Sequence, residues 1–355
     1  MCGKLTPGSD LLIKVALDAM GGDNAPGEIV RGAVSALSLI DDLSLVMVGR
    51  SDAIETELKG LSYPAARLEI AHTDEAIEGD DDPGLSIRRK KKASMVVAMQ
   101  MVRNGEAVAA LSAGNTGALM AGGILFLGRL SGVNRPALLT PMPSFGGKPV
   151  LFIDVGANMD ASPEQLLQYA HMGRIYAQQM LGNENPSIAL LNVGEESNKG
   201  NSQIRKAYGL FAENLPGFCG NVEGTQVFFG SADIVVCDGF VGNILLKVSE
   251  GLSRAILGYF RQEIGSSFRY KVGAKMLQPV FYGLREKIDD SGYGGAPLLG
   301  VNGLLIKCHG SSKARSIEQA LLKQACPFVR KNVTAKLQAA LQQIAPAVED
   351  DQDDR

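Results

Sequence analysis

Short apolar runs that alternate with longer segments of helical period limit the fold of this chain more than any other feature. The runs have the length and residue types of buried strands, and the segments between them, such as 163–180 and 203–213, have helical length. This alternation predicts an α/β fold in which helices cover a mainly parallel sheet. The strand-like runs are 11–17, 43–48, 67–71, 107–111, 150–153, 188–191 and 234–237.

Composition narrows the class of protein. Of the 355 residues 45% are hydrophobic, and no Gly/Ser/Pro-rich linker divides the middle. We therefore expect one continuous domain over 11–345, with flexible tails at 1–10 and 346–355. The net charge of −3 and the lack of tryptophan disfavour nucleic-acid binding. With no run of about 20 apolar residues and no signal-type start, a cytoplasmic location is expected.

Cysteine and histidine usage argues against disulfides and metal sites. The five cysteines are an odd number without a CxxC pair, which favours a reducing compartment. The histidines at 72, 171 and 309 are isolated in the sequence. Neither a metal ion nor another cofactor is therefore expected.

Five of the expected strands run directly into loops of glycine with asparagine or aspartate. Ligands in parallel sheets bind where the strands end, so we expect a shared polar crevice there. Glycine and asparagine also form ordinary tight turns, so a single loop of this kind would carry little weight. The first loop leads to a helix opening near 24–26, an arrangement that holds anions. The loops occupy 18–23, 112–117, 154–158, 192–201 and 238–243.

These loops and other segments resemble, in family order, the motifs of the phosphate acyltransferase (acyl-ACP:phosphate transacylase) family. The extra residues at 1–10 and the acidic tail depart from the family pattern but touch no motif. The matching segments are DAMGGD (18–23), RRKKKASM (88–95), SAGNTGALM (112–120), DVGAN (154–158), LLNVGEE (190–196), KGN (199–201), DGFVGN (238–243), YGGAPLLG (293–300) and HGSS (309–312).

The resemblance implies a reaction, a fold and partners. The reaction is transfer of a long-chain acyl group from acyl carrier protein to inorganic phosphate, which gives acyl-phosphate for phospholipid (phosphatidic acid) synthesis. The fold is a three-layer α/β/α arrangement similar to isocitrate and isopropylmalate dehydrogenases and to phosphotransacetylase. The implied assembly is a homodimer in peripheral contact with the membrane and with a membrane glycerol-3-phosphate acyltransferase.

Phosphate attack on a thioester needs an anion cradle, a donor for the oxyanion and a way to neutralise the departing sulfur. Backbone N–H groups of glycine loops suit phosphate, and amide side chains suit an oxyanion. The candidate substrate and phosphate ligands are Asp18, Gly21, Gly22, Asp23, Gly114, Asn115, Thr116, Gly117, Asp154, Asn158, Asn192, Gly194, Glu195, Asn201, Asp238, Gly239 and Gly242.

Three residues are the candidates for catalysis. Lys199 would hold phosphate or the oxyanion; on spacing alone a solvated loop lysine is the better interpretation, and the resemblance reverses that preference. Asn243 would donate a hydrogen bond to the carbonyl oxygen of the substrate, or would simply form a turn. Asn115, already included with the ligands above, has the same two interpretations. His309 would protonate the thiolate or bind phosphate, or be structural.

The pair Cys308-His309 leaves a covalent mechanism open, in which the thiol is acylated first. If both residues lie on a strand, their side chains point to opposite faces. Direct attack by phosphate is therefore favoured.

Five consecutive cations, Arg88, Arg89, Lys90, Lys91 and Lys92, stand in a chain of net negative charge. Such a run is usually a solvated helix start, and its members cannot all face one side. Complementary charge speeds the encounter of two proteins. We hypothesise that the run docks the acidic acyl carrier protein.

Residues 254–287 mix cations with large apolar residues, and Pro279 interrupts the second half. An interior proline breaks or bends a helix, so an amphipathic helical hairpin is predicted rather than one rod. Such a hairpin suits a membrane interface, a dimer interface or both. Its large apolar residues are Tyr259, Phe260, Phe268, Tyr270, Met276, Leu277, Val280, Phe281 and Tyr282.

Two other functions are weighed. A dehydrogenase of the isocitrate or isopropylmalate type would share the fold, but the chain has no GxGxxG fingerprint and no convincing aspartate–arginine cluster. A non-catalytic adaptor between carrier protein and membrane enzymes would use the cationic run and the hairpin. It would leave the glycine–asparagine loops unexplained.

Overall fold

The computed structural model of the chain describes residues 12–288 and 292–344, which form two compact units. The first unit holds 12–128 and 301–334, and the second holds 129–288, 292–300 and 335–344. The expectation of one continuous domain over 11–345 stays a prediction. The tails predicted at 1–10 and 346–355 lie outside the described residues.

The first unit is built on parallel strands in the order β3-β2-β1-β4-β11. The middle strand, β1, is enclosed by its neighbours, because Val15, Ala16 and Leu17 are fully buried. Its lack of exposed polar positions is typical of a parallel strand covered on both faces. The strands are β1 (Ile13–Asp18), β2 (Leu43–Gly49), β3 (Leu68–His72), β4 (Ala109–Ser112) and β11 (Leu305–Lys307).

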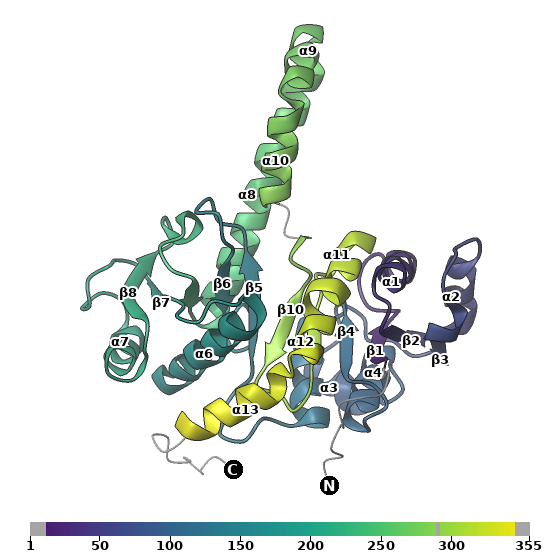
Figure 1. The fold of residues 1–355 in the computed structure, drawn as a ribbon, viewed down its shortest axis with the longest axis horizontal. Coiled ribbons are helices and arrows are strands. Elements are labelled where there is room, and N and C mark those ends of the chain that lie inside the picture. Colours follow the sequence, from purple (N-terminus) through teal and green to yellow (C-terminus); the bar gives the residue numbers. More distant parts are fainter. Residues whose placement is uncertain (1–11, 289–291, 345–355) are drawn as a thin grey trace. The chain divides into compact units, whose positions relative to one another are not determined.

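Helices lie on both sides of these strands (Figure 1). Helix α4 packs on β1, β2 and β4, whereas α1 packs on β2 and against α2 and α11. The helices are α1 (Gly27–Leu39), α2 (Ser51–Leu58), α3 (Pro83–Arg89), α4 (Ser94–Arg103), α5 (Thr116–Gly122), α11 (Ala314–Gln319) and α12 (Cys326–Arg330), with α13 (Val333–Ile344) following in the chain. Short 3₁₀ or π-helical turns occupy Ala65–Arg67, Gly123–Leu127 and Ala320–Ala325.

The second unit has strands in the order β10-β5-β6-β9-β7-β8. Strands β6, β9, β7 and β8 are mutually parallel, whereas β5 is antiparallel to both of its neighbours. The strands are β5 (Ala137–Met142), β6 (Val150–Ile153), β7 (Ile188–Asn192), β8 (Phe218–Glu223), β9 (Ile234–Val236) and β10 (Ala296–Leu299). The mainly parallel α/β architecture that the alternation predicts is therefore confirmed.

Helices α6 (Pro163–Tyr176) and α7 (Ser202–Asn214) cover strands of this unit. Helix α6 begins at Pro163 because the Ser162 hydroxyl accepts the Gln165 N–H (3.3 Å) while the Gln165 side chain accepts the Ser162 N–H (3.0 Å). It packs on β6 and β9 and against α7, and continues into a π-helical turn at Ala177–Leu181. A 3₁₀ turn at Val227–Phe229 precedes β9.

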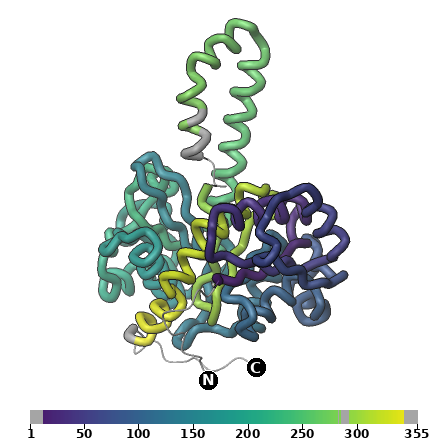
Figure 2. Tube along the Cα trace, turned by 45° about the vertical axis from the view of Figure 1, so that its right-hand side comes forward, coloured from purple at the N-terminus to yellow at the C-terminus, as the bar shows by residue number. Residues whose placement is uncertain are grey.

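A helical hairpin leaves the strands of the second unit, as the sequence predicts. Helix α8 (Gly239–Ser266) runs outward, and α9 (Phe268–Met276) and α10 (Gln278–Ile288) return beside it (Figure 2). The rings of Phe260 and Phe281 lie 6.0 Å apart across the two limbs. The first limb begins at Gly239 rather than at 254, and the second breaks at Leu277, just before Pro279. No described helix combines the length and the apolar character needed to cross a membrane.

Candidate functional site

In the first unit, the loops after β1 and β4 are held together by the carboxylate of Asp18. This side chain is buried and accepts hydrogen bonds from the hydroxyls of Ser94 and Ser112, both at 2.6 Å, and from the Met20 N–H at 3.2 Å. Burial raises the pKa of Asp18, and these donors counteract the rise. Because its oxygens are already engaged, Asp18 organises the loops around it.

The glycines of these loops allow a very close approach of two backbone segments. A Cβ at Gly21 would lie 2.3 Å from the Asp18 carboxylate and 2.8 Å from the amide nitrogen of Gly114. Gly22 has a φ of +102°, which side chains rarely tolerate. The two loops could therefore not pack this way with alanine at these positions.

The turn that contains His309 joins the same cluster. The Asp23 N–H donates to the Gly310 carbonyl at 2.8 Å, so the HGSS segment lies directly beside the glycine turn. His309 is exposed, and its Nδ1 accepts the Ser311 N–H at 3.1 Å. In its neutral form the ring therefore carries its proton on Nε2.

Lys307 is a cation beside this cluster that sequence reasoning missed. Its Nζ lies 3.5 Å from the Ala113 carbonyl and also donates to the Cys308 carbonyl. Burial lowers the pKa of Lys307, while the charges of Asp18 and Asp23 raise it. The available signal was a lysine at the end of an apolar strand, directly before the HGSS motif.

The strand assumed for Cys308 and His309 ends earlier than expected. Strand β11 stops at Lys307, so the argument from alternating faces does not apply to the two residues. Their surroundings differ nevertheless, because Cys308 is buried and His309 is exposed.

The side chain of Asn115 caps helix α5. Its Oδ1 accepts the Ala118 N–H at 3.0 Å, and its Nδ2 donates to the carbonyls of Gly79 (3.1 Å) and Asp81 (3.3 Å). Donation to a substrate oxygen would require these bonds to break. Thr116 and Gly117 form the first turn of the same helix.

In the second unit, Asp154 plays the same organising part as Asp18. Its buried carboxylate accepts the N–H groups of Asn158 (2.7 Å), Ala157 (2.9 Å) and Leu138 (3.0 Å). Burial raises the pKa of Asp154 to about 6 against the effect of these donors. Asn158 is held in turn, because its Nδ2 donates to the Pro136 carbonyl at 2.6 Å.

The loop that opens α8 is packed directly onto the Asp154 loop. The Gly239 N–H donates to the Asn158 carbonyl at 2.8 Å, and a Cβ at Gly242 would stand 1.9 Å from the Asp154 carbonyl oxygen. Asp238 caps the helix by accepting the Val241 N–H at 2.8 Å. The two predicted motifs, 154–158 and 238–243, are therefore in direct contact.

Asn243 faces the Asp154 loop and keeps its amide group free. A Cβ at Gly156 would lie 3.6 Å from the Asn243 Cγ. Within the described residues, no hydrogen bond engages the side-chain amide of Asn243, in contrast to that of Asn115. An amide in this state is available to a ligand.

Lys199 lies in the loop that follows β7. The Asn192 Nδ2 donates to the Lys199 carbonyl at 3.2 Å, and the lysine stem packs over Gly194, where a Cβ would lie 2.9 Å from its Cγ. Its Nζ is 4.0 Å from the Glu196 carboxylate, and the side chain is half exposed. The loop fixes the stem and leaves the charge accessible.

Two other predicted residues of this loop have structural partners. Asn201 caps α7 by accepting the Ile204 N–H at 2.9 Å. The Glu195 carboxylate accepts a hydrogen bond from the Gln226 side chain.

One side chain of the cationic run, that of Lys90, is held by hydrogen bonds, whereas the other four are exposed. Lys90 donates to the Asp81 carboxylate at 2.5 Å and to the Ala76 carbonyl at 3.1 Å. The Lys92 N–H donates to the Glu75 carboxylate at 3.1 Å, which fixes the backbone of the run.

The predicted loops thus form two clusters, one in each unit. The first unit brings the loops after β1, β4 and β11 together. In the second unit the loops after β6 and β9 are in contact, and the loop after β7 follows the strand next to β9. The crevice expected to be shared by all five loops stays a prediction, as does the expectation that no metal or other cofactor takes part.

Comparison with known proteins gives consistent matches over most of the chain. A family described as "Fatty acid synthesis protein" matches residues 13–336. A protein of Heliobacterium modesticaldum named phosphate acyltransferase is 50% identical over 328 residues, 92% of this chain and 97% of the relative. Proteins of the same name from Moorella thermoacetica (48%; 87% and 90% covered) and Geobacillus thermodenitrificans (46%; 93% and 99% covered) are also similar.

Solved structures support the fold. A phosphotransacetylase from Streptococcus pyogenes matches with a TM-score of 0.59 and 17% identity, covering 90% of this chain and 96% of that one. A branched-chain phosphotransacylase from Enterococcus faecalis matches with a TM-score of 0.54 and 16% identity, covering 90% and 99%. The α/β/α fold is therefore phosphotransacetylase-like.

Proposed function

Since this chain belongs to the fatty acid synthesis protein family and is an acyltransferase of the phosphate acyltransferase kind, we propose that it moves a long-chain acyl group from acyl carrier protein to inorganic phosphate. The product is acyl-phosphate, which then enters phospholipid synthesis. The family membership favours this interpretation over the dehydrogenase and adaptor alternatives.

The observation that carries the proposal is the free amide of Asn243, which lies on α8 opposite Gly156 of the Asp154 loop. Helix α8 follows β9, and the Lys199 loop follows the neighbouring strand β7. A phosphate oxygen attacks the thioester carbon, forming a C–O bond and a tetrahedral oxyanion. The C–S bond then breaks, and the thiolate leaves with the bonding electrons and takes up a proton. Asn243 donates to the oxyanion, and Lys199 holds phosphate by its charge.

The other predicted residues divide into ligands and organisers. Asp18 and Asp154 are buried acceptors of hydrogen bonds, so we assign them to positioning the loops rather than to contact with phosphate. The backbone N–H groups of the glycine turns remain the candidate phosphate ligands in each unit. His309 remains a candidate for binding phosphate or protonating the thiolate, through the proton on Nε2.

The carrier docks on the exposed cations of the run at Arg88, Arg89, Lys91 and Lys92. The double variant Lys91→Glu/Lys92→Glu should raise the KM for acyl-carrier with little change in kcat. Lys206→Glu, an exposed position on α7, is the matched control. An unchanged KM in the double variant would remove the docking assignment.

The hairpin serves dimerisation and peripheral membrane contact. Along α8, large apolar side chains at intervals of four residues are exposed, a face that a second copy of the chain would bury. The stripe comprises Phe240, Ile244, Val248, Leu252 and Ile256. Toward α9, residues 264–277 contain three cations and no acid, with Phe268 and Met276 about 80% exposed.

Two measurements separate these roles of the hairpin. Sedimentation equilibrium of the full chain reports the dimer, and Ile244→Glu/Val248→Glu should yield monomer. Flotation with vesicles containing anionic lipid reports membrane contact, and Phe268→Ser/Met276→Ser should reduce it. Failure of the full chain to float with vesicles of anionic lipid would contradict the membrane role.

The reaction itself is tested with purified protein, palmitoyl-carrier and phosphate. Acyl-phosphate is trapped with hydroxylamine while the freed carrier thiol is titrated. Thiol release that requires phosphate and matches the hydroxamate formed would support the proposal. Release without phosphate would indicate a thioesterase instead.

A further inference from the structure

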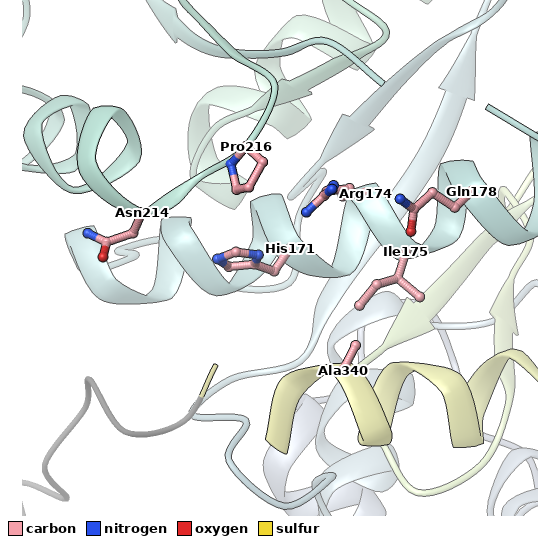
Figure 3. Close-up of a pocket in the computed structure, with 7 residues that line it drawn as sticks. All are labelled: His171, Arg174, Ile175, Gln178, Asn214, Pro216 and Ala340. Carbon is pink, nitrogen blue, oxygen red and sulfur yellow. The ribbon is translucent and has the colours of Figure 1, made fainter. Parts of the chain in front are cut away.

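A cavity of about 330 Å³ in the second unit lies apart from the strand-end loops. Its walls come from helix α6 and the turn after it, from the end of α7, and from α13 (Figure 3). The lining residues are His171, Arg174, Ile175, Gln178, Asn214, Pro216 and Ala340. Cavities of this volume suit small ligands.

The cavity lies at the edge of the sheet where the strands begin. Helix α6 starts after the loop that follows β6 and leads toward the start of β7 at Ile188. Arg174 lies in its last turn, and Gln178 lies in the π-helical turn that continues it. Pro216 precedes the start of β8 by two residues. The Asp154 and Lys199 loops stand at the opposite edge, where the parallel strands end. A ligand in the cavity would therefore occupy a second site.

His171 contributes an unsatisfied polar atom to this region. The residue is 5% exposed, and its Nε2 is buried without a hydrogen-bond partner. Burial and, to a smaller extent, the charge of Arg174 lower the pKa of His171 to about 4. The ring is thus neutral near pH 7, and a buried nitrogen of this kind normally has a partner.

Arg174 gives the cavity its charge. Among the described residues, no carboxylate lies within ion-pair distance of its guanidinium, and no acidic side chain lines the cavity. Gln178 donates to the Glu184 carbonyl (2.8 Å) and Asn214 to the Leu210 carbonyl (3.0 Å), so both amides are oriented by the protein. A guanidinium in such surroundings suits a carboxylate or a phosphate.

The remaining lining is apolar. The apolar part comes from Ile175, Pro216 and Ala340, and a short hydrocarbon group could pack against it. Pockets that join a few fixed polar groups to apolar walls are typical of small-molecule sites.

We propose that this cavity binds a small organic anion, with its carboxylate or phosphate on Arg174 and its apolar part on Ile175 and Pro216. The two amides, of Gln178 and Asn214, complete the polar contacts. The site is distinct from the one that handles acyl transfer, so the proposal does not depend on the reaction.

Butyl phosphate and butyrate are the probes, because they share a four-carbon chain and differ in the anionic group. Butyramide is the uncharged control. Calorimetric titration of the full chain should show saturable binding of at least one anion and none of butyramide. The two anions together identify which charged group the cavity prefers.

Variants locate the binding. Arg174→Met should weaken it by about tenfold or more, because a charge-assisted bond is lost. Ala340→Phe should block the cavity without changing charge, whereas Arg315→Met, at an exposed position in the first unit, should have no effect. Thermal unfolding of each variant confirms that it is folded. If Arg174→Met does not fold, Arg174→Lys, which retains the positive charge, takes its place.

The variant Lys199→Met distinguishes binding of the probe in the cavity from binding at the proposed acyl-transfer site. Binding of the probe that persists in Lys199→Met and is lost in Ala340→Phe supports the cavity. Binding lost in Lys199→Met but kept in Ala340→Phe places the probe at the strand-end loops and overturns the proposal. Dissociation constants above about 10 mM for both anions also overturn it.

Discussion

Gly242 lies so close to the backbone carbonyl of Asp154 that a Cβ at residue 242 would stand 1.9 Å from the oxygen. That approach sets where α8 begins relative to the loop after β6. It also sets the position of Asn243, the next residue, opposite Gly156. The smallest residue is therefore required where the two motifs meet.

Replacing Gly242 by alanine should move α8 away from this loop. We expect a loss of stability of about 1–3 kcal/mol from overpacking. Turnover should fall as well, because Asn243 moves with the helix. Urea unfolding and the hydroxamate assay measure the two effects.

Gly251→Ala is the matched control on the same helix. A Cβ there meets no atom within 4 Å. It should stabilise the protein by up to about 1 kcal/mol, because alanine favours a helix over glycine. If Gly242→Ala behaves like Gly251→Ala, the close contact does not exist in solution.

Asn243 and Asn115, the two candidate amide donors, should respond differently to replacement by alanine. Asn243→Ala removes a free amide, so we expect kcat to fall about 10²–10³-fold at nearly unchanged stability. Asn115→Ala removes a helix cap and should cost about 1 kcal/mol of stability, with kcat affected much less. Steady-state kinetics and denaturant unfolding of both variants check this. The reverse pattern would exchange the two roles.

Sequence periodicity predicted most of the parallel strands but missed β5, β8, β10 and β11. The run 43–48 is apolar except for Ser44 and forms most of β2, in which every residue is buried, as is typical of a strand covered on both faces. Strand β8 (Phe218–Glu223) was missed since it contains cysteine, glycine, asparagine and glutamate, and only Val222 is buried. An edge strand of this kind is mostly exposed, so its sequence shows little hydrophobic periodicity.

The residues of the candidate site were likewise predicted only in part from the sequence. Glycine and aspartate in the loops after Leu17 and Ile153 were identified, but their roles were not, because carboxylates that bind a ligand and those that organise a loop share one sequence signature. Burial separates them, as Asp18 and Asp154 show. Lys307 was missed because its neighbours Asp18 and Asp23 are nearly 300 residues away in sequence.

Lys199 should matter for catalysis and hardly at all for stability. Its ion pair with Glu196 is long, at 4.0 Å, and both side chains are largely exposed. For Lys199→Met we expect kcat/KM for phosphate to fall about 100-fold or more, since a charge-assisted contact is lost. Kinetics at varied phosphate, with Lys206→Met as the control, measure the effect. Normal phosphate kinetics would return Lys199 to the role of a solvated loop lysine.

Asp154 should make stability decrease as the pH rises above its ordinary pKa. Burial raises the pKa of Asp154 from 3.8 to about 6 in the folded protein. Between these values the folded chain keeps a proton that the unfolded chain has released, so this group favours unfolding as pH increases, by at most about 1.4 kcal/mol per pH unit. Above the folded pKa the effect is constant.

Asp154→Asn isolates this contribution because asparagine does not titrate. The free energy of unfolding of the parent minus that of the variant should fall from about pH 4 to about pH 6. Denaturant unfolding at several pH values gives this difference. A difference that rises with pH would mean that the backbone donors stabilise the carboxylate more than burial disfavours it.

Cys308 should be dispensable for acyl transfer. Burial raises the pKa of its thiol to about 12, and the residue is 1% exposed, so almost no thiolate exists at neutral pH to attack a thioester. Cys308→Ala should keep near-normal kcat and cost about 1 kcal/mol of stability for the small cavity it leaves. Cys219, an exposed thiol, provides the control: it should react with iodoacetamide without loss of turnover. Loss of turnover in a folded Cys308→Ala protein, with an acylated Cys308 in the parent detected by mass spectrometry, would establish the covalent route instead.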